Sequence, residues 1–222
     1  MATVFIAGGT GYIGRRTIPR LLQRNHRVVA LVRPGSERRL TGGCELVCGD
    51  PLERDSFAAA VARADTFLQL VGVPHPSPSK AQQFLHVDLR SARESIGAAV
   101  AARIGHFVYV SVAQPAPVMR AYQAARAEGE RLLRGSGLRH TVLRPWYVLG
   151  PGHRWPYALL PVYWTLERLP STRASARRLG LVTIDQMVDA IVAAVESPPA
   201  GGSRIVEVPD IRQTRISTAL AG

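Results

Sequence analysis

The sequence of 222 residues predicts one α/β domain, residues 1–222, built on a doubly wound parallel sheet of about seven strands. Short apolar segments alternate with longer amphipathic ones, as expected for strands that are buried on both faces and covered by helices. The first apolar segment ends abruptly in a glycine-rich turn, and a helical pattern follows at once. About 70 residues follow Gly152, so the region 150–180 is expected to be a short substrate-side or interface segment.

The opening stretch, ATVFIAGGTGYIG, predicts a phosphate-binding turn. Thr3–Ala7 is expected to be a buried strand, and a helix is expected after Gly14. In the spacing Gly8-x-x-Gly11-x-x-Gly14, the first glycine allows a tight turn, the second lets the backbone approach a pyrophosphate, and the third lets the helix pack closely. The helix N-terminus would offer amide groups and a partial positive charge to the phosphates. The alternative is a glycine-rich surface turn without a ligand.

The segment IAGGTGYIG resembles the cofactor turn of the short-chain dehydrogenase/reductase superfamily. More narrowly, it resembles the atypical branch with NmrA-like, complex-I-accessory-like and NAD-dependent epimerase/dehydratase-related proteins, and the resemblance continues almost to the C-terminus. It implies a Rossmann fold with NAD(P)(H) bound at the carboxyl ends of the strands. The cofactor-binding positions that it implies are Gly8, Thr10, Gly11, Tyr12, Ile13, Gly14, Asp50, Pro51, Leu52, Val71, Gly72, Ser111, Arg126 and Pro145.

The second expected strand, His26–Val32, ends at Arg33. In a dinucleotide fold this strand end faces the adenosine ribose, where an acidic residue would accept a hydrogen bond from the 2′-hydroxyl of NAD. An arginine can instead pair with the 2′-phosphate of NADP, so NADP(H) is the expected cofactor and NAD(H) the alternative. The competing interpretation is that Arg33 is one more surface arginine in an arginine-rich chain, whose only lysine is Lys80.

Two further strand ends are expected beside the cofactor. Glu45–Cys48 is followed by Asp50-Pro51-Leu52, which resembles the turn that lies along the adenine in the superfamily. The alternative role for Asp50 is a cap on the next helix, expected over Arg54–Ala64. Thr66–Val71 is the fourth expected strand and leaves the sheet at Gly72, and the proline-containing loop after it is expected to border the site.

The chemistry is expected on the helix that opens at Tyr122. Before it come a helix over Ala81–Arg103 and a fifth strand, His106–Val110, which ends on Ser111. Tyr122-x-x-x-Arg126 resembles the superfamily's Tyr-x-x-x-Lys signature, in which residues four apart share one helix face. The resemblance implies that Tyr122 exchanges a proton, that Ser111 binds the substrate oxygen and that Arg126 places its charge beside the nicotinamide ribose. Arginine keeps the charge of lysine but does not deprotonate, and the alternative for Tyr122 is a packed aromatic.

The C-terminal third contains one segment that resembles a specific motif of the superfamily and one apolar segment whose role has several interpretations. After a sixth strand, Arg139–Leu143, the sequence RPWYVLGPG resembles the part of the superfamily that closes over the nicotinamide, which makes Pro145 a cofactor contact. The apolar segment Trp155–Leu169 is too short to span a bilayer; a substrate pocket, a partner interface, a membrane surface and a core helix remain open for it. Asp185 is expected to cap a helix, and Arg204–Val208 to be the last strand before a tail.

A net charge of +12 and a pI of about 11 raise the question of an anionic partner. Arg16, Arg20 and Arg24 form a basic stripe on the first expected helix, but no nucleic-acid-binding motif accompanies it, so a solvated helix face is favoured over nucleic-acid binding. No apolar run predicts a membrane span and no signal peptide is apparent, so a cytoplasmic protein is expected. Cys44 and Cys48 are expected to be buried thiols, and no metal site is predicted.

The expected function is an NADP(H)-dependent oxidoreductase that transfers hydride between nicotinamide and a small apolar carbonyl or quinone-like substrate. Tyr122 would be the acid/base, Ser111 the donor to the substrate oxygen and Arg126 the charge beside the ribose. The alternative is a sensor or accessory protein that binds NAD(P)H without turnover, which Arg126 in place of lysine and the apolar segment 155–169 motivate. The resemblance also leaves a homodimer open, because helix-mediated dimers are common in the superfamily.

Overall fold

A seven-stranded parallel sheet forms the centre of the molecule in the computed structural model, which describes residues 1–40, 42–152 and 177–216. The strand order is β3-β2-β1-β4-β5-β6-β9, and every neighbouring pair is parallel. The strands are β1 (Thr3–Ala7), β2 (Arg27–Val32), β3 (Glu45–Cys48), β4 (Thr66–Gln69), β5 (His106–Val110), β6 (His140–Leu143) and β9 (Ser203–Val206). This order confirms the predicted doubly wound Rossmann fold with a seventh strand.

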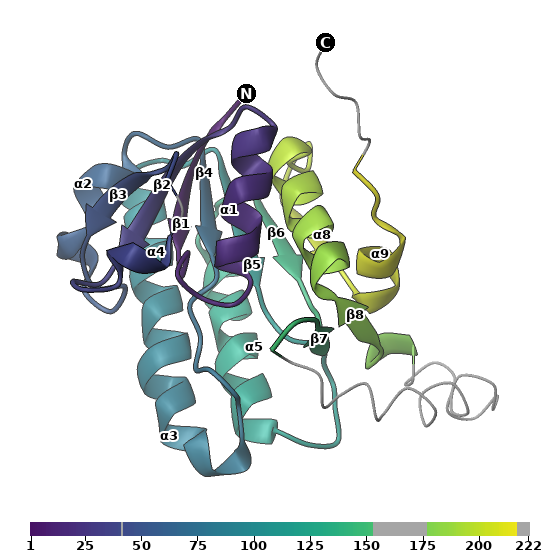
Figure 1. Cartoon of the computed structure of the whole chain (residues 1–222). Coiled ribbons are helices and arrows are strands. Elements are labelled where there is room, and N and C mark those ends of the chain that lie inside the picture. The colour runs from purple at the N-terminus through teal and green to yellow at the C-terminus, as the bar shows by residue number, and fades with distance from the viewer. Residues whose placement is uncertain (41, 153–176, 217–222) are drawn as a thin grey trace.

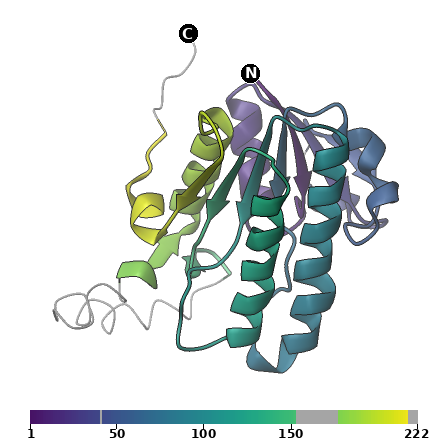
Figure 2. The ribbon, with the colours of Figure 1, turned by 180° about the vertical axis from the view of Figure 1, so that it is seen from behind.

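Helices cover both faces of the sheet because alternate strand residues point to opposite sides (Figure 1). Val4 and Ile6 of β1 belong to the core beneath α1 (Gly14–Gln23) and α8 (Ile184–Glu196). Phe5 belongs to the core on the other side, where α2 (Ala58–Val61), α4 (Arg90–Ala101) and α5 (Arg120–Gly135) lie (Figure 2). Near-continuous apolar strands are therefore what this layered arrangement requires.

The helix expected over Ala81–Arg103 is interrupted by a π-helical segment. It consists of α3 (Ala81–Gln83), the π-helical η4 (Phe84–Leu89) and α4. A π-helical segment inserts an extra residue per turn and often marks a functional position. It changes which side chains the helix turns toward α5, and Asp88 lies in it.

The side chain of Gln123, in the first turn of α5, holds the loop that leads into this helix. Met119, the residue before the helix, has a left-handed backbone with φ of 62°. The amide of Gln123 accepts a hydrogen bond from Ala116 N at 2.8 Å and donates to Ala116 O and Val118 O. Gln123 thus fixes the loop that leads into the helix carrying Tyr122.

Several expected boundaries were wrong. The helix expected over Arg54–Ala64 is divided into the 3-10 turn η2 (Arg54–Ser56) and the short α2. Thr183, rather than Asp185, caps α8, because its hydroxyl accepts from Gln186 N while the Gln186 side chain accepts from Thr183 N. Part of the expected tail forms α9 (Val208–Gln213). Further short elements are η1 (Glu37–Arg39), η3 (Pro78–Lys80), and the strands β7 (Tyr147–Leu149) and β8 (Leu181–Thr183), which pair with each other.

The whole of the apolar segment Trp155–Leu169, and most of region 150–180, lie outside the described residues. Among the helices that are described, none combines the length and the apolar character needed to cross a bilayer.

Candidate functional site

The glycine turn has the geometry expected of a phosphate-binding turn. Gly8 has φ of +87°, and a Cβ there would lie 2.7 Å from Leu70 C and 2.8 Å from Val71 N, at the exit of β4. A Cβ on Gly14 would overlap the backbone of Gly8 itself, so the third glycine lets α1 begin directly against the turn. A Cβ on Gly11 would lie 3.1 Å from Gly8 O, a tight contact, and would meet no other atom within 4 Å.

The N-terminus of α1 can accept an anion. The Gly11 amide donates to Gly8 O at 3.0 Å and closes the turn. No atom of the described residues accepts a hydrogen bond from the amides of Thr10 and Ile13, and the first turn of α1 contains no acidic side chain. Unpaired amides and the helix dipole therefore point at the same place, as a dinucleotide pyrophosphate requires.

The expected adenosine side lies where β2 and β3 end together, because Val32 pairs with Cys48. Arg33 follows directly and is exposed. Asp50 does not cap a helix: its carboxylate accepts from Leu52 N at 2.9 Å and shapes its own turn. The sequence analysis overlooked Glu37, whose pKa is lowered by hydrogen bonds from backbone amides, including Gly35 N at 3.1 Å. An ionised carboxylate therefore shares this loop with Arg33.

Arg126 is buried at the exits of β4 and β5 with only 5% of its surface exposed. Nη1 donates to Val110 O at 3.0 Å and Nη2 donates to Val71 O at 3.2 Å. Nη2 also lies 2.7 Å from Oδ1 of Asp88, which is completely buried. Gly72 is required here, because a Cβ on it would collide with the Arg126 guanidinium. Asp88 is the site residue that the sequence analysis missed, since nothing in the sequence pairs it with Arg126.

Two opposing effects act on this ion pair. Burial raises the pKa of Asp88, and the Arg126 guanidinium and the Val73 amide, which donates to Oδ2 at 3.1 Å, oppose it. Burial acts to lower the pKa of Arg126, but Tyr122, Tyr109 and Asp88 outweigh it and raise the pKa. The guanidinium is therefore a permanent charge with a buried counter-ion.

Tyr122 lies against this arginine at the start of α5. Its ring centroid is 5.4 Å from Cζ of Arg126 and 5.0 Å from the ring of Phe84 in η4, at a tilt of 55°. The side chain is half-buried. The structure therefore brings Tyr122, Arg126, Gly72 and Val71 together, as the resemblance implies.

The Ser111 hydroxyl is directed toward Glu130 rather than toward Tyr122. Its hydroxyl donates to Oε1 of Glu130 at 2.6 Å, two helical turns along α5 from Tyr122. Glu130 is 1% exposed and also accepts from Gln114 Nε2 and from the guanidinium of Arg144. In this conformation the hydroxyl hydrogen of Ser111 is committed to Glu130 and does not point toward the phenol.

The segment after β6 returns to the glycine turn. Pro145 O accepts from Ala113 N at 2.9 Å, which joins the loops after β5 and β6. A Cβ on Gly150 would overlap the hydroxyl of Tyr12. Arg16 stacks over the Tyr12 ring and donates to Pro151 O at 3.4 Å. Tyr12 thus forms the contact between the phosphate turn and the segment expected to close over the nicotinamide.

The basic stripe on α1 is engaged in contacts within the chain. Arg20 pairs with Asp189 of α8 at 3.4 Å, and Arg24 pairs with Glu196 of the same helix. Arg16 contacts the main-chain oxygens of Tyr12 and Pro151. These contacts agree with the interpretation of the stripe as a helix face rather than a nucleic-acid site.

The two cysteines differ in their exposure to solvent. Cys44 is partly buried, but Cys48 is exposed, so the expectation that both are buried was wrong for Cys48; no disulfide joins them. The described residues contain no cluster of histidine, cysteine and carboxylate side chains that could hold a metal ion.

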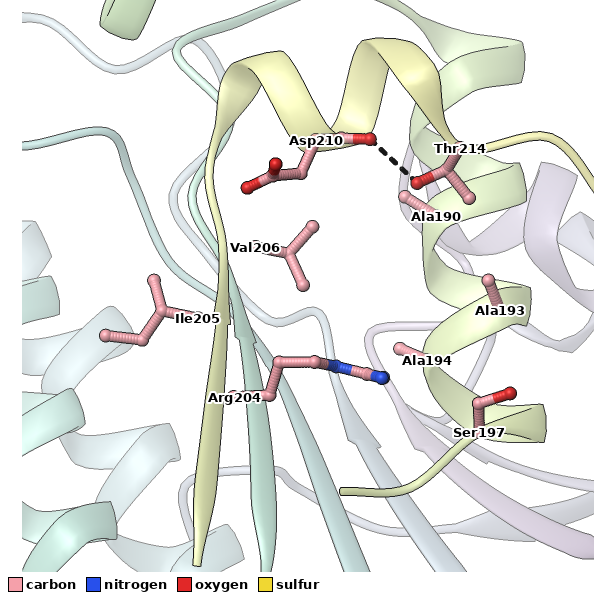
Figure 3. A pocket seen from close by; sticks show the side chains of 9 residues that line it. All are labelled: Ala190, Ala193, Ala194, Ser197, Arg204, Ile205, Val206, Asp210 and Thr214. Atoms are coloured by element: carbon pink, nitrogen blue, oxygen red, sulfur yellow. Dashed lines mark hydrogen bonds between the residues drawn. The ribbon is translucent and has the colours of Figure 1, made fainter. Parts of the chain in front are cut away.

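A cavity of about 360 Å³ lies away from this site, between β9, α8 and α9 (Figure 3). Arg204 projects from β9 toward Ala194, and Asp210 borders the opening. β9 is the edge strand, and β4, β5 and β6 separate it from β1. The cavity is therefore not part of the glycine-turn site.

Comparisons with known proteins agree with this geometry. A family described as NAD(P)H-binding matches residues 8–158, more than half of the chain. Ceramide reductase of Caulobacter vibrioides is 26% identical over 215 residues, covering 95% of this chain and 65% of that protein. A 3-diazoavenalumate denitrifying reductase of a Streptomyces species is 30% identical over 227 residues, covering 89% of this chain and 73% of that protein. The chain thus spans slightly less than two thirds of ceramide reductase.

Among solved structures, the enzyme WbmH of Bordetella bronchiseptica in complex with NAD+ superposes with a TM-score of 0.70. The match covers 93% of this chain and 75% of that one at 19% identity, so it shows a common fold. UDP-glucose 4-epimerase of Thermus thermophilus, in complex with NAD, superposes with a TM-score of 0.67, covering 94% of this chain and 80% of that one at 17% identity. With its glycine turn, its strand order and a family match over most of its length, the chain has a Rossmann fold and belongs to the NAD(P)H-binding family.

Proposed function

We propose that the chain is an NADP(H)-dependent oxidoreductase acting on a small apolar carbonyl or quinone-like substrate. One observation carries the proposal: a continuous line of contacts joins the phosphate turn to the phenol. Gly8 abuts Val71, Arg126 binds Val71 O beneath Gly72, and the Arg126 guanidinium lies under the ring of Tyr122. A dinucleotide held by the turn would therefore extend its reactive half toward Tyr122.

In this proposal the bound reduced dinucleotide supplies the hydride. Tyr122 gives its phenolic proton to the substrate oxygen as that oxygen gains negative charge, and the phenolate then recovers a proton from water. Arg126 holds a fixed positive charge beneath the ring and stabilises the phenolate between these steps. Ser111 can donate to the substrate oxygen only after its hydroxyl turns away from Glu130.

Two observations support the cofactor and substrate classes. Arg33 is exposed directly after β2, where it can reach a 2′-phosphate. Glu37 in the same loop would oppose that phosphate, so the preference for NADP(H) depends on which charge lies nearer. Ceramide reductase, one of the relatives, acts by its printed name on a lipid, which supports an apolar substrate for this chain.

The cofactor proposal is tested by titrating the protein with NADPH and NADH at the same salt concentration. We expect the protein to bind NADPH more tightly than NADH. Arg33→Ala should weaken the binding of NADPH by about tenfold and leave the binding of NADH nearly unchanged. Arg93→Ala, which removes an exposed arginine from α4, is the matched control. Equal binding of both cofactors by the unmodified protein would remove the phosphate role of Arg33 and leave the dinucleotide site in place.

A second candidate is an NAD(P)H-binding sensor or accessory protein without turnover. The observation that favours it is the ion pair with Asp88, which leaves Arg126 buried rather than presented to a ribose. Tyr122→Phe separates the candidates, because it removes only the phenolic oxygen. Reduction of a panel of carbonyls and quinones that falls about a hundredfold or more in this variant supports the enzyme. Unchanged reduction removes Tyr122 from the catalytic step, and the absence of reduction in either protein despite NADPH binding supports the sensor.

A further inference from the structure

We propose that Asp88 is a positioning residue of the dinucleotide site. Together with Arg126 it forms a clamp on residues 71–73, where the chain leaves β4, and it shapes the groove for the nicotinamide half of the cofactor. The inference rests on the function proposed above, because it assumes that a dinucleotide crosses this edge of the sheet.

The clamp holds three consecutive residues from two sides. Arg126 Nη2 donates to Val71 O at 3.2 Å, and Asp88 Oδ2 accepts from Val73 N at 3.1 Å. The Asp88–Arg126 pair, at 2.7 Å, closes the loop of contacts between them. Gly72 lies in the middle, where any side chain would displace the guanidinium. The path of the main chain after β4 is therefore set by this pair rather than by the sheet.

The π-helical segment brings Asp88 to this position. The residue is fully buried in η4, and its main-chain oxygen accepts from Ser91 Oγ at 3.2 Å. Ser91 Oγ in turn accepts from Gln69 Nε2 at 3.2 Å, and Gln69 is a fully buried residue of β4 itself. A polar network inside the apolar core is costly, so its concentration at one strand exit indicates a role beyond packing.

The clamp lies on the nicotinamide side of the crevice. The strand order reverses between β1 and β4, and a dinucleotide crosses an open α/β sheet at that point. β2 and β3 lie on the adenosine side, whereas the exits of β4 and β5 lie on the other. Gly8 touches Leu70 and Val71, so a shift of the clamped residues would also reach the edge of the phosphate turn.

Two buried polar atoms of the clamp leave capacity for further contacts. Arg126 Nε has no hydrogen-bond partner among the described residues, and Asp88 Oδ1 meets Arg126 only as an ion contact. The same face of α5 also contains the fully satisfied Glu130. Incomplete pairing is therefore found in the clamp and at the neighbouring Tyr109 hydroxyl, but not at Glu130.

The test compares a whole cofactor with its adenosine half. Dissociation constants for NADPH and for 2′,5′-ADP are measured by calorimetry on the unmodified protein and on Asp88→Asn, which keeps an acceptor for Val73 N but removes the charge. We expect NADPH to bind about tenfold more weakly to Asp88→Asn, with 2′,5′-ADP changed less than about twofold. NADH and 5′-ADP serve as the equivalent pair if the protein prefers NAD.

A second variant keeps the proposal testable if Asp88→Asn does not fold by circular dichroism. Gly72→Ala displaces Arg126 from the clamp without changing any charge, and the same selective loss of NADPH is expected. Gly105→Ala is the matched control, since its new methyl group would meet Asp65 O at an ordinary 3.4 Å. We expect Gly105→Ala to bind both ligands as the unmodified protein does.

The outcomes separate the two proposals. If the variants lose affinity for NADPH and for 2′,5′-ADP to the same extent, or for neither, the proposal for the clamp is overturned while the dinucleotide site stands. An unmodified protein that binds none of the four ligands overturns the proposed function, and the clamp with it. A selective loss of the whole cofactor in either variant supports Asp88 as a positioning residue.

Discussion

Two buried arginine–carboxylate pairs share α5, and they are satisfied to very different degrees. Glu130 accepts from Ser111, Gln114 and Arg144, and Arg144 also binds Glu207 at the start of α9. The Asp88–Arg126 pair retains a buried Nε and a carboxylate oxygen that have no hydrogen-bond partner among the described residues. The first pair has the complete pairing expected of a structural joint. The second lies at the cofactor edge and has incomplete pairing, which is typical of a functional site.

The largest expected effect concerns the structural joint. Arg144→Met leaves Glu130 buried without its main counter-ion, so we expect the free energy of unfolding to fall by about 3–5 kcal/mol in urea titrations. Arg134→Met is the matched control, because Arg134 contacts the same carboxylate at 3.5 Å but is half exposed. Similar losses for the two variants would show that Glu130 does not depend on Arg144 and would remove the contrast between the pairs.

A smaller effect, dependent on pH, is expected at the cofactor edge. Arg126→Met leaves Asp88 buried alone, and burial already raises the pKa of Asp88. When folding raises the pKa of a carboxyl group, the protein becomes less stable as pH rises above the pKa of that group in the unfolded chain, about 3.9. We therefore expect Arg126→Met to lower the free energy of unfolding by about 3 kcal/mol at pH 7, and by less toward pH 4.

The double variant Asp88→Asn/Arg126→Met checks the cause of this pH dependence. Because it has no buried carboxyl group at this position, the double variant should be more stable than Arg126→Met at pH 7, and this difference should shrink toward pH 4. A difference between the two variants that does not change with pH would assign the pH dependence to another group.

The contribution of His106 to the pH dependence of stability must be measured separately from that of the two ion pairs. Burial, with the nearby Arg139, lowers the pKa of His106 to about 4. A histidine whose pKa is lowered on folding stabilises the protein fully above its unfolded pKa of about 6.5, and this contribution is lost as pH falls toward 4. We expect His106→Gln to reduce the loss of stability between pH 7 and pH 5 by about 2 kcal/mol. An unchanged loss would mean that His106 is protonated in the folded protein.

The smallest expected effect sets the scale for exposed pairs. Arg20 and Asp189 join α1 and α8 at 3.4 Å, with 44% and 23% of their side chains exposed. Arg20→Gln should therefore cost less than about 1 kcal/mol, and the cost should disappear in 1 M salt. A larger cost that resists salt would indicate that exposure is a poor guide to the strength of pairs in this chain.

The order of the strands, the glycine turn and the register of Tyr122 and Arg126 on one helix could be predicted from the sequence. Parallel strands buried on both faces must be nearly continuous apolar runs, so Thr3–Ala7 and His106–Val110 were predicted to the residue. The edge strand Glu45–Cys48 was also predicted to the residue, although its residues alternate between half-buried and exposed. The turn was predictable because two of its requirements are local: Gly8 has a positive φ of +87°, and a Cβ on Gly14 would meet the backbone of Gly8 and Gly9. Such features depend on neighbours along the chain, which a sequence displays directly.

The partners that these residues take depend on how the helices and strands pack in three dimensions. Asp88 and Arg126 are 38 positions apart, and a π-helical segment that leaves no clear sequence signal turns one toward the other. Ser111 has the residue type expected beside the substrate, yet its hydroxyl donates its hydrogen bond to Glu130 of α5. In a buried site a side chain pairs with the best partner within reach, and that choice depends on how whole helices pack, which no local pattern encodes.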